Sequence, residues 1–167
     1  LDRGADVNPK SNNGTTALML ASQKGHPSCI SMLLDRGADA NAKDDNDGVT
    51  ALMWASQEGH PSCISVLLDR GADVNAKTDD RGTALMLASQ EGHPSCISLL
   101  LDRGADVNAK NNDSWTALMA ASQEGHPSCI SLLLDGGADV DAKKNGGWTA
   151  LMIASGKGHP SCISLLL

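Results

Sequence analysis

The six-residue segment GHPSCI occurs five times in this 167-residue chain, and the repetition limits the possible folds more than any other feature. The copies begin at Gly25, Gly59, Gly92, Gly125 and Gly158, which are 34, 33, 33 and 33 residues apart. A fixed period of this length is typical of a stack of similar units, each of which contacts its neighbours. We therefore expect one repeat array over residues 1–167, with units at approximately 1–33, 34–67, 68–100, 101–133 and 134–167.

Each unit is predicted to contain two short helices followed by an extended arm. Thr16 suits the N-cap of a first helix that Gly25 ends, and Pro27 suits the first turn of a second helix that Gly37 ends. The polar segment that follows is rich in Asn, Asp and Gly, which favours an arm with a tight turn. Both helices are too short to be stable alone, so each unit must bury its apolar side against its neighbours. That side is expected to include Ala17, Leu18, Ala21 and Ser22 on the first helix and Cys29, Ile30, Leu33 and Leu34 on the second.

Several segments at this period resemble the ankyrin repeat family, whose usual signature is T-P-L-H-x-A. They are TALM-x-A, the Gly-His that follows, the leucine-rich second helix and GAD-V-N-A. The resemblance covers essentially the whole chain and implies an all-α solenoid of helix-turn-helix units with β-hairpin-like arms. In the family, a histidine ties neighbouring units by hydrogen bonds. Met19 and its equivalents replace it here, so we expect apolar packing by methionine to substitute for those bonds.

The histidine and cysteine of GHPSCI suggest either chemical sites or structural residues. Equivalent residues of stacked helical units lie roughly 8–10 Å apart, which is too far for a disulfide or a shared zinc ion. The sequence offers no third group for nucleophilic catalysis, and it contains no P-loop or HExxH motif. We therefore expect Cys29 and its equivalents to be core thiols, and His26 and its equivalents to stabilise a turn. The segment is predicted not to be an enzyme and to need no metal or cofactor.

The composition and the ends of the chain limit the classes of partner and the cellular location that we expect. The formal net charge of −7 argues against nucleic acid, and no apolar run is long enough to span a membrane. Five widely spaced cysteines favour a reducing compartment, and so an intracellular, cytoplasmic location. The chain begins at Leu1 and ends in an apolar segment, so we expect a fragment of a longer protein without capping units. Such ends would allow two copies to stack head to tail.

The five units differ mainly in their arm tips and first helices, whereas the second helices barely change. In the ankyrin family these two elements line the concave face that binds partners. The resemblance therefore implies a non-catalytic scaffold that binds another protein through this face. The alternative is a structural or elastic spacer array without a specific binding face, because exposed positions also tolerate random change.

Trp115 and Trp148 occupy equivalent places in adjacent units, so they should stand side by side and anchor a partner across units three to five. Packing of each tryptophan against its own arm is the alternative, and Trp54 is expected to fill space between first helices. The charge of this face is predicted to be negative in the middle and positive at both ends. The candidate binding residues are Trp115, Trp148, Trp54, Val49, Asp45, Asp47, Asp79, Asp80, Arg81, Asn112, Asp113, Glu58, Glu91 and Glu124.

The resemblance also implies a modification. Asn75 and Asn108 each lie in a D-V-N-A segment eight residues after a leucine, a setting in which ankyrin asparagines can be hydroxylated by an Fe(II)/2-oxoglutarate enzyme. Asp141 breaks this pattern in unit five, and Asn41 follows Ala40 instead of valine.

Overall fold

In the computed structural model, which describes residues 4–167, a helix begins at the alanine of every TALM segment and at the proline of every GHPSCI segment. No strand and no helix able to span a membrane occurs in that range. The all-α repeat fold predicted from the sequence is therefore confirmed. The first helices are α1 (Ala17–Gln23), α3 (Ala51–Gln57), α5 (Ala84–Glu91), α7 (Ala117–Glu124) and α9 (Ala150–Lys157). The second helices are α2 (Pro27–Asp35), α4 (Pro61–Asp69), α6 (Pro94–Asp102), α8 (Pro127–Asp135) and α10 (Pro160–Leu166).

The helix ends follow the predicted local signals. The Thr16 hydroxyl accepts the backbone N–H of Met19 at 3.3 Å, which satisfies one of the free amides at the start of α1. Gly25 ends this segment with a φ of 71°, and Pro27 is the first residue of α2. Gly37, with a φ of 87°, follows the second helix, so the chain can turn into the arm.

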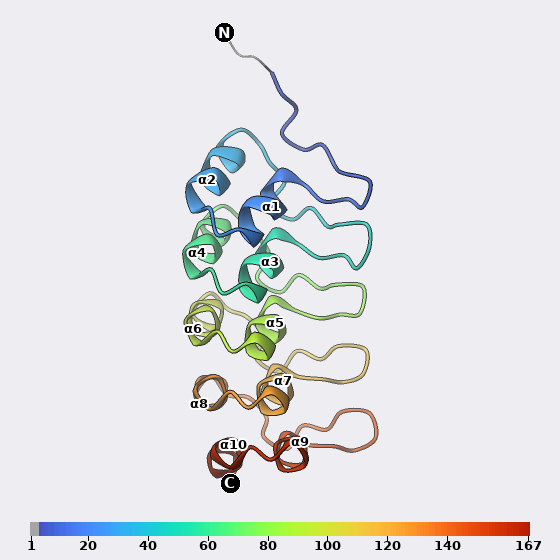
Figure 1. Cartoon of the computed structure of the whole chain (residues 1–167), viewed down its shortest axis with the longest axis vertical. Coiled ribbons are helices and arrows are strands. Elements are labelled where there is room, and N and C mark those ends of the chain that lie inside the picture. Colours follow the sequence, from blue (N-terminus) through green and yellow to red (C-terminus); the bar gives the residue numbers. More distant parts are fainter. Residues whose placement is uncertain (1–3) are drawn as a thin grey trace.

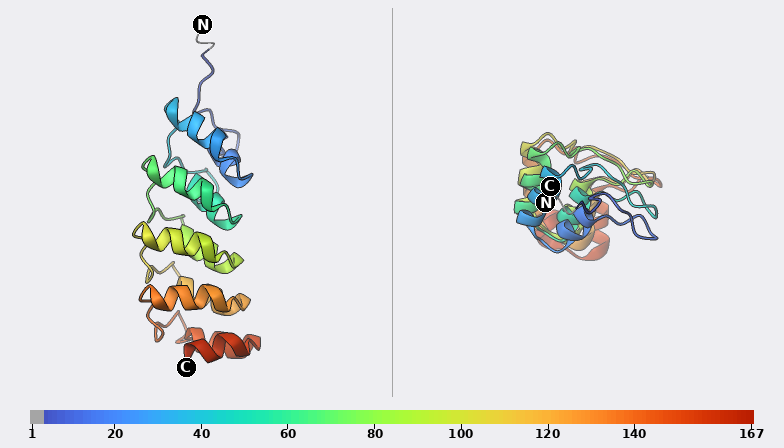
Figure 2. Two further views of the ribbon diagram at one scale, coloured as in Figure 1. Left: turned by 90° about the vertical axis from the view of Figure 1, so that its left-hand side faces the viewer. Right: turned by 90° about the horizontal axis from the view of Figure 1, so that it is seen from above.

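The helices form two parallel columns, with the arms projecting together to one side (Figures 1 and 2). Each first helix contacts the first helix of the next unit, and each second helix contacts the next second helix. Because every unit adds to both columns, the apolar core is a continuous layer along the stack. Its fully buried side chains include Leu52, Ile64, Leu85 and Ile97.

Two residues predicted to be buried are exposed. Ala17 and Cys29 lie on the surface, whereas their equivalents in the later units, such as Ala51 and Cys63, are buried. These later residues lie in helices that pack on the preceding helix pair, and α1 and α2 are the first pair of the described chain. The expectation of an interior position was therefore wrong for Ala17 and for Cys29.

Two of the methionines in the first helices accept hydrogen bonds in addition to the apolar packing expected from the sequence. The Met19 sulfur accepts the backbone N–H of Thr16 at 3.4 Å, and the Met53 sulfur accepts that of Thr50 at 3.5 Å. Each thioether therefore both fills the core and returns a weak hydrogen bond to its own helix cap. Met152, in α9 of the last unit, is 53% exposed.

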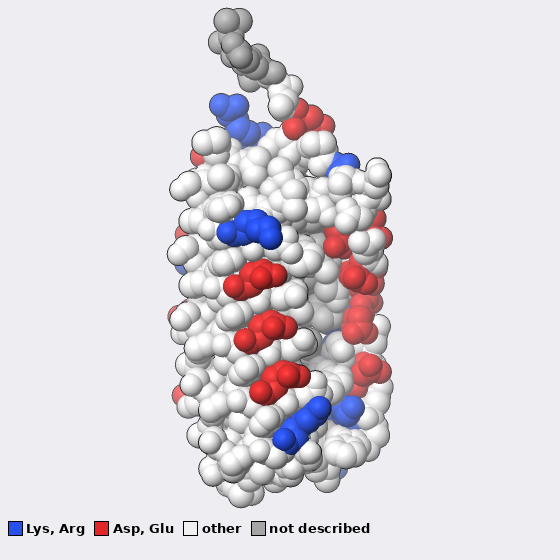
Figure 3. All heavy atoms as spheres, in the orientation of Figure 1, with Lys and Arg blue, Asp and Glu red and all other residues white. Residues whose placement is uncertain are grey.

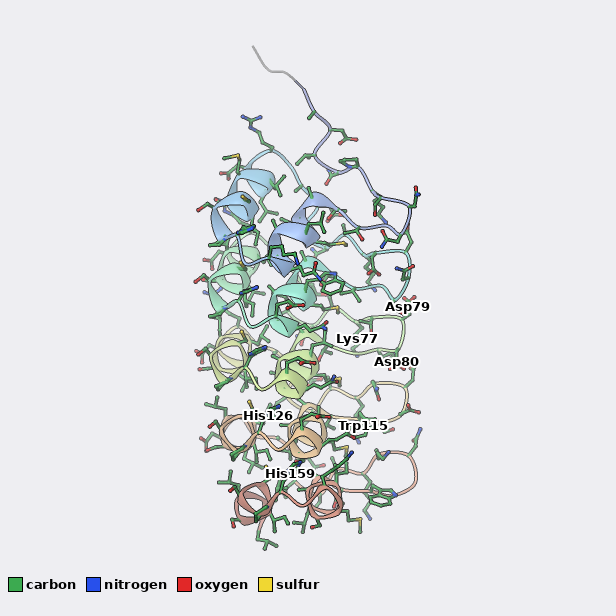
Figure 4. The ribbon with its side chains drawn as sticks, in the orientation of Figure 1. Lys77, Asp79, Asp80, Trp115, His126 and His159 are labelled. Atoms are coloured by element: carbon green, nitrogen blue, oxygen red, sulfur yellow. The ribbon has the colours of Figure 1, made fainter. Side chains whose placement is uncertain are left out.

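The histidines of the GHPSCI segments join consecutive units. The Nε2–H groups of His60, His93, His126 and His159 donate to the carbonyl oxygens of Gln23, Gln57, Gln90 and Gln123, at distances of 2.9–3.2 Å. Each ring also lies over a glycine of the preceding unit. A Cβ built on Gly92 would lie 2.6 Å from the His126 ring. The two labelled histidines in Figure 4, His126 and His159, lie between the helix columns. These contacts give the histidines a structural role, but the side-chain hydrogen bonds join consecutive units instead of stabilising the local turn as expected.

A second ladder joins the units beside the second helices. The Asn75 side-chain amide donates to the Gly104 carbonyl at 3.0 Å and accepts the Asp106 backbone N–H at 2.8 Å. Asn8, Asn41 and Asn108 make the same two bonds with their following units. One asparagine side chain thus satisfies two backbone groups of its neighbour, which fixes the spacing of the stack.

We predict that Gly92→Ala destabilises the array by about 1–2 kcal/mol more than Gly104→Ala. Both glycines have positive φ, 76° and 85°, so both variants carry the cost of a left-handed alanine. The added methyl group displaces the His126 ring at Gly92, whereas nothing lies within 4 Å of it at Gly104. Urea unfolding followed by circular dichroism measures the difference. Equal losses would show that the imidazole contact contributes nothing to stability.

Candidate functional site

The arms form a hydrogen-bonded ladder that holds their tips in register. Within the second arm, the Asp44 backbone N–H donates to the Val49 carbonyl at 3.0 Å. Between arms, the Asp79 N–H donates to the Asp47 carbonyl at 2.9 Å, and the Asn112 N–H donates to the Asp80 carbonyl at 3.0 Å. The tip side chains therefore recur at the spacing of the units, as a recognition surface requires.

The arms of units three and four have an unusual backbone. At the same place in the turn, units one, two and five have Gly14, Gly48 and Gly147, all with positive φ. Units three and four have Arg81 and Ser114 there, with φ of 63° and 61°. A side chain in this conformation is strained, and such strain is often retained at functional positions. The replacement of glycine by Arg81 and Ser114 is visible when the five units are aligned, but the positive φ of these two residues is known only from the structure.

An open cavity of about 290 Å³ lies between units three and four. The variable position of the first helix is Leu20, Trp54, Leu87 or Ile153 in four units, but Ala120 in unit four. Ala120 is one of the residues that line this cavity, and it has the smallest side chain found at this position in the five units. The lining residues are Thr78, Asp80, Gly82, Met86, Leu87, Gln90, Asn111, Trp115, Thr116, Ala120 and Gln123.

A second open cavity, of about 300 Å³, lies between units four and five. Trp115 and Gln123 also line this one, so the two cavities are contiguous, and we refer to them together as the groove. Trp148 is 50% exposed, and the Lys144 ammonium lies 4.8 Å from the centre of the Trp115 ring, within cation–π range. The lining residues are Trp115, Gln123, Lys144, Trp148, Ile153, Gly156 and Lys157. The two tryptophans therefore do stand side by side, on a common cavity.

Charge is arranged in rows on either side of this hollow. Figure 3 shows a row over the first helices that is basic at its two ends and acidic between them. The equivalent residues at the ends of α1, α3, α5, α7 and α9 are Lys24, Glu58, Glu91, Glu124 and Lys157. A second, mostly acidic row follows the arms, where Asp79 and Asp80 are labelled in Figure 4. An acidic middle and basic ends are the pattern expected from the sequence.

The remaining candidate residues lie outside the two cavities. Trp54 and Val49 are half-buried against the core, in keeping with a packing role for Trp54. Asp45 is exposed and pairs with Lys10 at 2.9 Å. Asp47, Asn112 and Asp113 are exposed on the arms, as are the three glutamates on the first-helix row. The groove thus brings together Trp115, Trp148 and Asp80 from the candidate set, and adds Gln90, Ala120, Gln123 and Lys144, which are not in that set.

The cysteines have the properties of core thiols, apart from Cys29. Burial raises the pKa of Cys96 and Cys129 to about 11, and the neighbouring Cys129 and Cys63 thiols add to the shift at Cys96. Burial also raises the pKa of Cys63 and Cys162. A raised pKa disfavours the reactive thiolate. Over residues 4–167 no group of His, Cys, Asp and Glu side chains is placed to hold a metal ion.

A family model described as ankyrin repeats (3 copies) matches the chain at residues 1–78, 45–111 and 85–167. Together these matches span the chain. Among curated proteins, none matches the chain. The location in a reducing compartment stays a prediction.

We predict that Cys29 is the one thiol that reacts quickly with a disulfide reagent at pH 8 in the folded protein. It is exposed, whereas the other four are buried and have raised pKa values. The absorbance of the thiolate released from the reagent measures the number of thiols that react quickly, and Cys29→Ser should abolish this fast phase. Fast reaction of two or more thiols would contradict the burial.

The same shifts predict a loss of stability in alkali. Between the unfolded thiol pKa near 9 and the folded value of about 11, the folded state keeps protons that the unfolded state has lost. The stabilisation is complete below about pH 9 and should decline as the pH rises towards 11. Replacing Cys96 and Cys129 by alanine should flatten this part of the stability curve, measured by urea unfolding.

Proposed function

Because the chain belongs to the ankyrin repeat family, whose members are generally protein–protein interaction modules, we propose that it binds an extended segment of another protein in the groove of units three to five. The family is typically non-catalytic, and we assign no reaction to this chain. The second helices serve as the scaffold that holds the groove in place.

The shared wall of the two cavities is the observation that carries this proposal. Each cavity has roughly the volume of a small binding pocket, and Trp115 lines both. Mixed lining by tryptophan, methionine, leucine and amide side chains suits a peptide, since the apolar groups supply affinity and the amides fix orientation. Trp148 leaves half of its surface exposed at the edge of the second cavity. Tryptophan is among the residues most often found to dominate binding energy.

If the chain is a spacer array instead, the same residues are expected to have no role in binding. In a spacer, Ala120, Arg81 and Ser114 are random changes, and binding does not depend on them. The strained arm residues Arg81 and Ser114 and the cavity lined by Ala120 belong to the same two units, which favours a binding face. Head-to-tail stacking of two copies stays a prediction. Its N-terminal contact, at Leu1, lies outside the described residues, and light scattering at high concentration tests it.

Hydroxylation of Asn75 and Asn108 is a further part of the proposal, resting on the family resemblance. Both side-chain amides are bonded to the following unit, so a hydroxylase would have to act on a locally opened segment. Intact-mass analysis after exposure to an Fe(II)/2-oxoglutarate asparagine hydroxylase should show one added oxygen at each site. The Asn75→Ala/Asn108→Ala variant should gain none at these positions. An unchanged mass of the wild-type chain would contradict this assignment.

The proposed function is tested by selecting binders from a displayed library of random peptides on the purified chain. We expect peptides whose affinity falls at least about tenfold on Trp115→Ala/Trp148→Ala, because the two rings form the main apolar surface of the groove. Met32→Ala is the matched control, since Met32 is a large exposed apolar residue on α2, outside the groove. Circular dichroism verifies that all variants remain folded. Binding that is indifferent to the tryptophans and to exchange of the arm tips would favour the spacer.

A further inference from the structure

The two cavities of the groove differ in charge. Asp80 is the one charged residue among the described residues that line the first cavity. The second cavity is lined by Lys144 and Lys157 and by no described carboxylate. A partner that fills both cavities therefore meets an acidic wall over units three and four and a basic wall over units four and five.

The Trp115 ring separates these two environments. Lys144 lies 4.8 Å from its centre and lines the second cavity, so the protein supplies its own cation on that side. The first cavity contains the same ring but no lysine or arginine among its described lining residues. The Asp80 carboxylate lines the same cavity and accepts one hydrogen bond, from the Asn111 side-chain amide at 3.1 Å, so its other oxygen is the acceptor left for a cation beside the ring. Arginine suits both, because its planar guanidinium stacks on aromatic rings and forks onto carboxylates.

The charges around the groove support the same polarity. Glu91 directly follows Gln90, which lines the first cavity, while Glu124 follows Gln123, which lines both cavities. On the arm, Asp80 is flanked by Asp79 and by Arg81. Figure 3 shows these acidic rows on both sides of the hollow and the basic groups beyond them. Such rim charges are each weak and screened by salt, but together they steer the approach and orientation of a charged partner. They also oppose a phosphate backbone at the first cavity.

The spacing of the cavities sets the spacing of the partner's side chains. The cavities lie between successive pairs of units, so they are one unit apart along the stack. Packed helices are separated by roughly 8–10 Å, which about three residues of an extended chain span. A side chain in each cavity must therefore be about three residues from the other.

We propose that the partner is an extended peptide segment of defined charge order. An arginine or lysine enters the first cavity between Asp80 and Trp115. About three residues away, an apolar side chain packs on Trp148 and Ile153, beside a carboxylate that pairs with Lys144 or Lys157. This inference rests on the proposed function and names the class of partner.

The first test is the sequence pattern of the selected peptides. Peptides that depend on Trp115 and Trp148 should carry a basic residue about three positions from an apolar residue, with an acidic residue next to the apolar one. A pool that depends on the tryptophans but has no such pattern overturns the charge order and leaves the proposed function intact. A selection without any tryptophan-dependent peptide overturns both.

The second test is a double-mutant cycle on one selected peptide. Asp80→Asn should weaken the peptide about five- to tenfold, and the same change should have little effect once the peptide's basic residue is replaced by glutamine. Asp47→Asn is the matched control, because it removes an equal charge from the arm of unit two, outside both cavities. The assignment of the first cavity would be overturned if the two variants weakened the peptide equally. It would also be overturned if Asp80→Asn weakened the peptide to the same extent with and without the peptide's basic residue.

A third variant tests the effect of filling the first cavity without changing its charge. Ala120→Leu restores the larger side chain found at this position in unit three and leaves every charge in place. It should fill the first cavity and lower the affinity for the basic peptide by about tenfold, while binding of a peptide with alanine at that position changes little. Unchanged affinity for the basic peptide would show that its cation binds elsewhere. Isothermal titration calorimetry supplies all of these affinities.

Discussion

The contact between one unit and the next is the constraint on which the rest of the structure depends. A helix of seven to nine residues is not stable in water, so each pair persists because its neighbours cover its apolar sides. Two polar ladders accompany this burial. The histidines satisfy glutamine carbonyls of the preceding unit, and the asparagines satisfy two backbone groups of the following one. Among the described residues, no buried side-chain nitrogen or oxygen is left without a partner.

This arrangement divides the chain into a constant scaffold and a variable face. The residues that make contacts between units, such as His126 and Asn108, recur from unit to unit, so they are not available for recognition. The arms are joined to one another through backbone hydrogen bonds, which do not depend on side-chain identity, so the residues at the arm tips can vary. Ala120 lines the first cavity, and the arms of the same two units present Arg81 and Ser114 in a strained conformation. Local strain of this kind is tolerated because the rest of each unit determines the fold.

Much of the fold follows from the sequence because its determinants are local. The threonine caps, the prolines that start the second helices and the left-handed glycines act within a few residues, and the period of 33 supplies the stacking. The groove was less predictable. Pairing of Trp115 with Trp148 follows from the register, but the cavities depend on the volumes of side chains from adjacent units. The exposure of Cys29 also depends on which helices pack against its unit, and so do the hydrogen bonds between the histidines and the glutamine carbonyls. Comparing the sequences of the units does not reveal these contacts.

If a partner binds in the groove of units three to five, the three tryptophans report it directly. Their indole N–H groups give separate nuclear magnetic resonance signals, and Trp54 lies outside the groove. On titration with a selected peptide, we expect the Trp115 and Trp148 signals to shift together with a common affinity while the Trp54 signal stays in place. Shifts confined to Trp54 or to residues of the second helices, with Trp115 and Trp148 unmoved, would contradict binding in the groove.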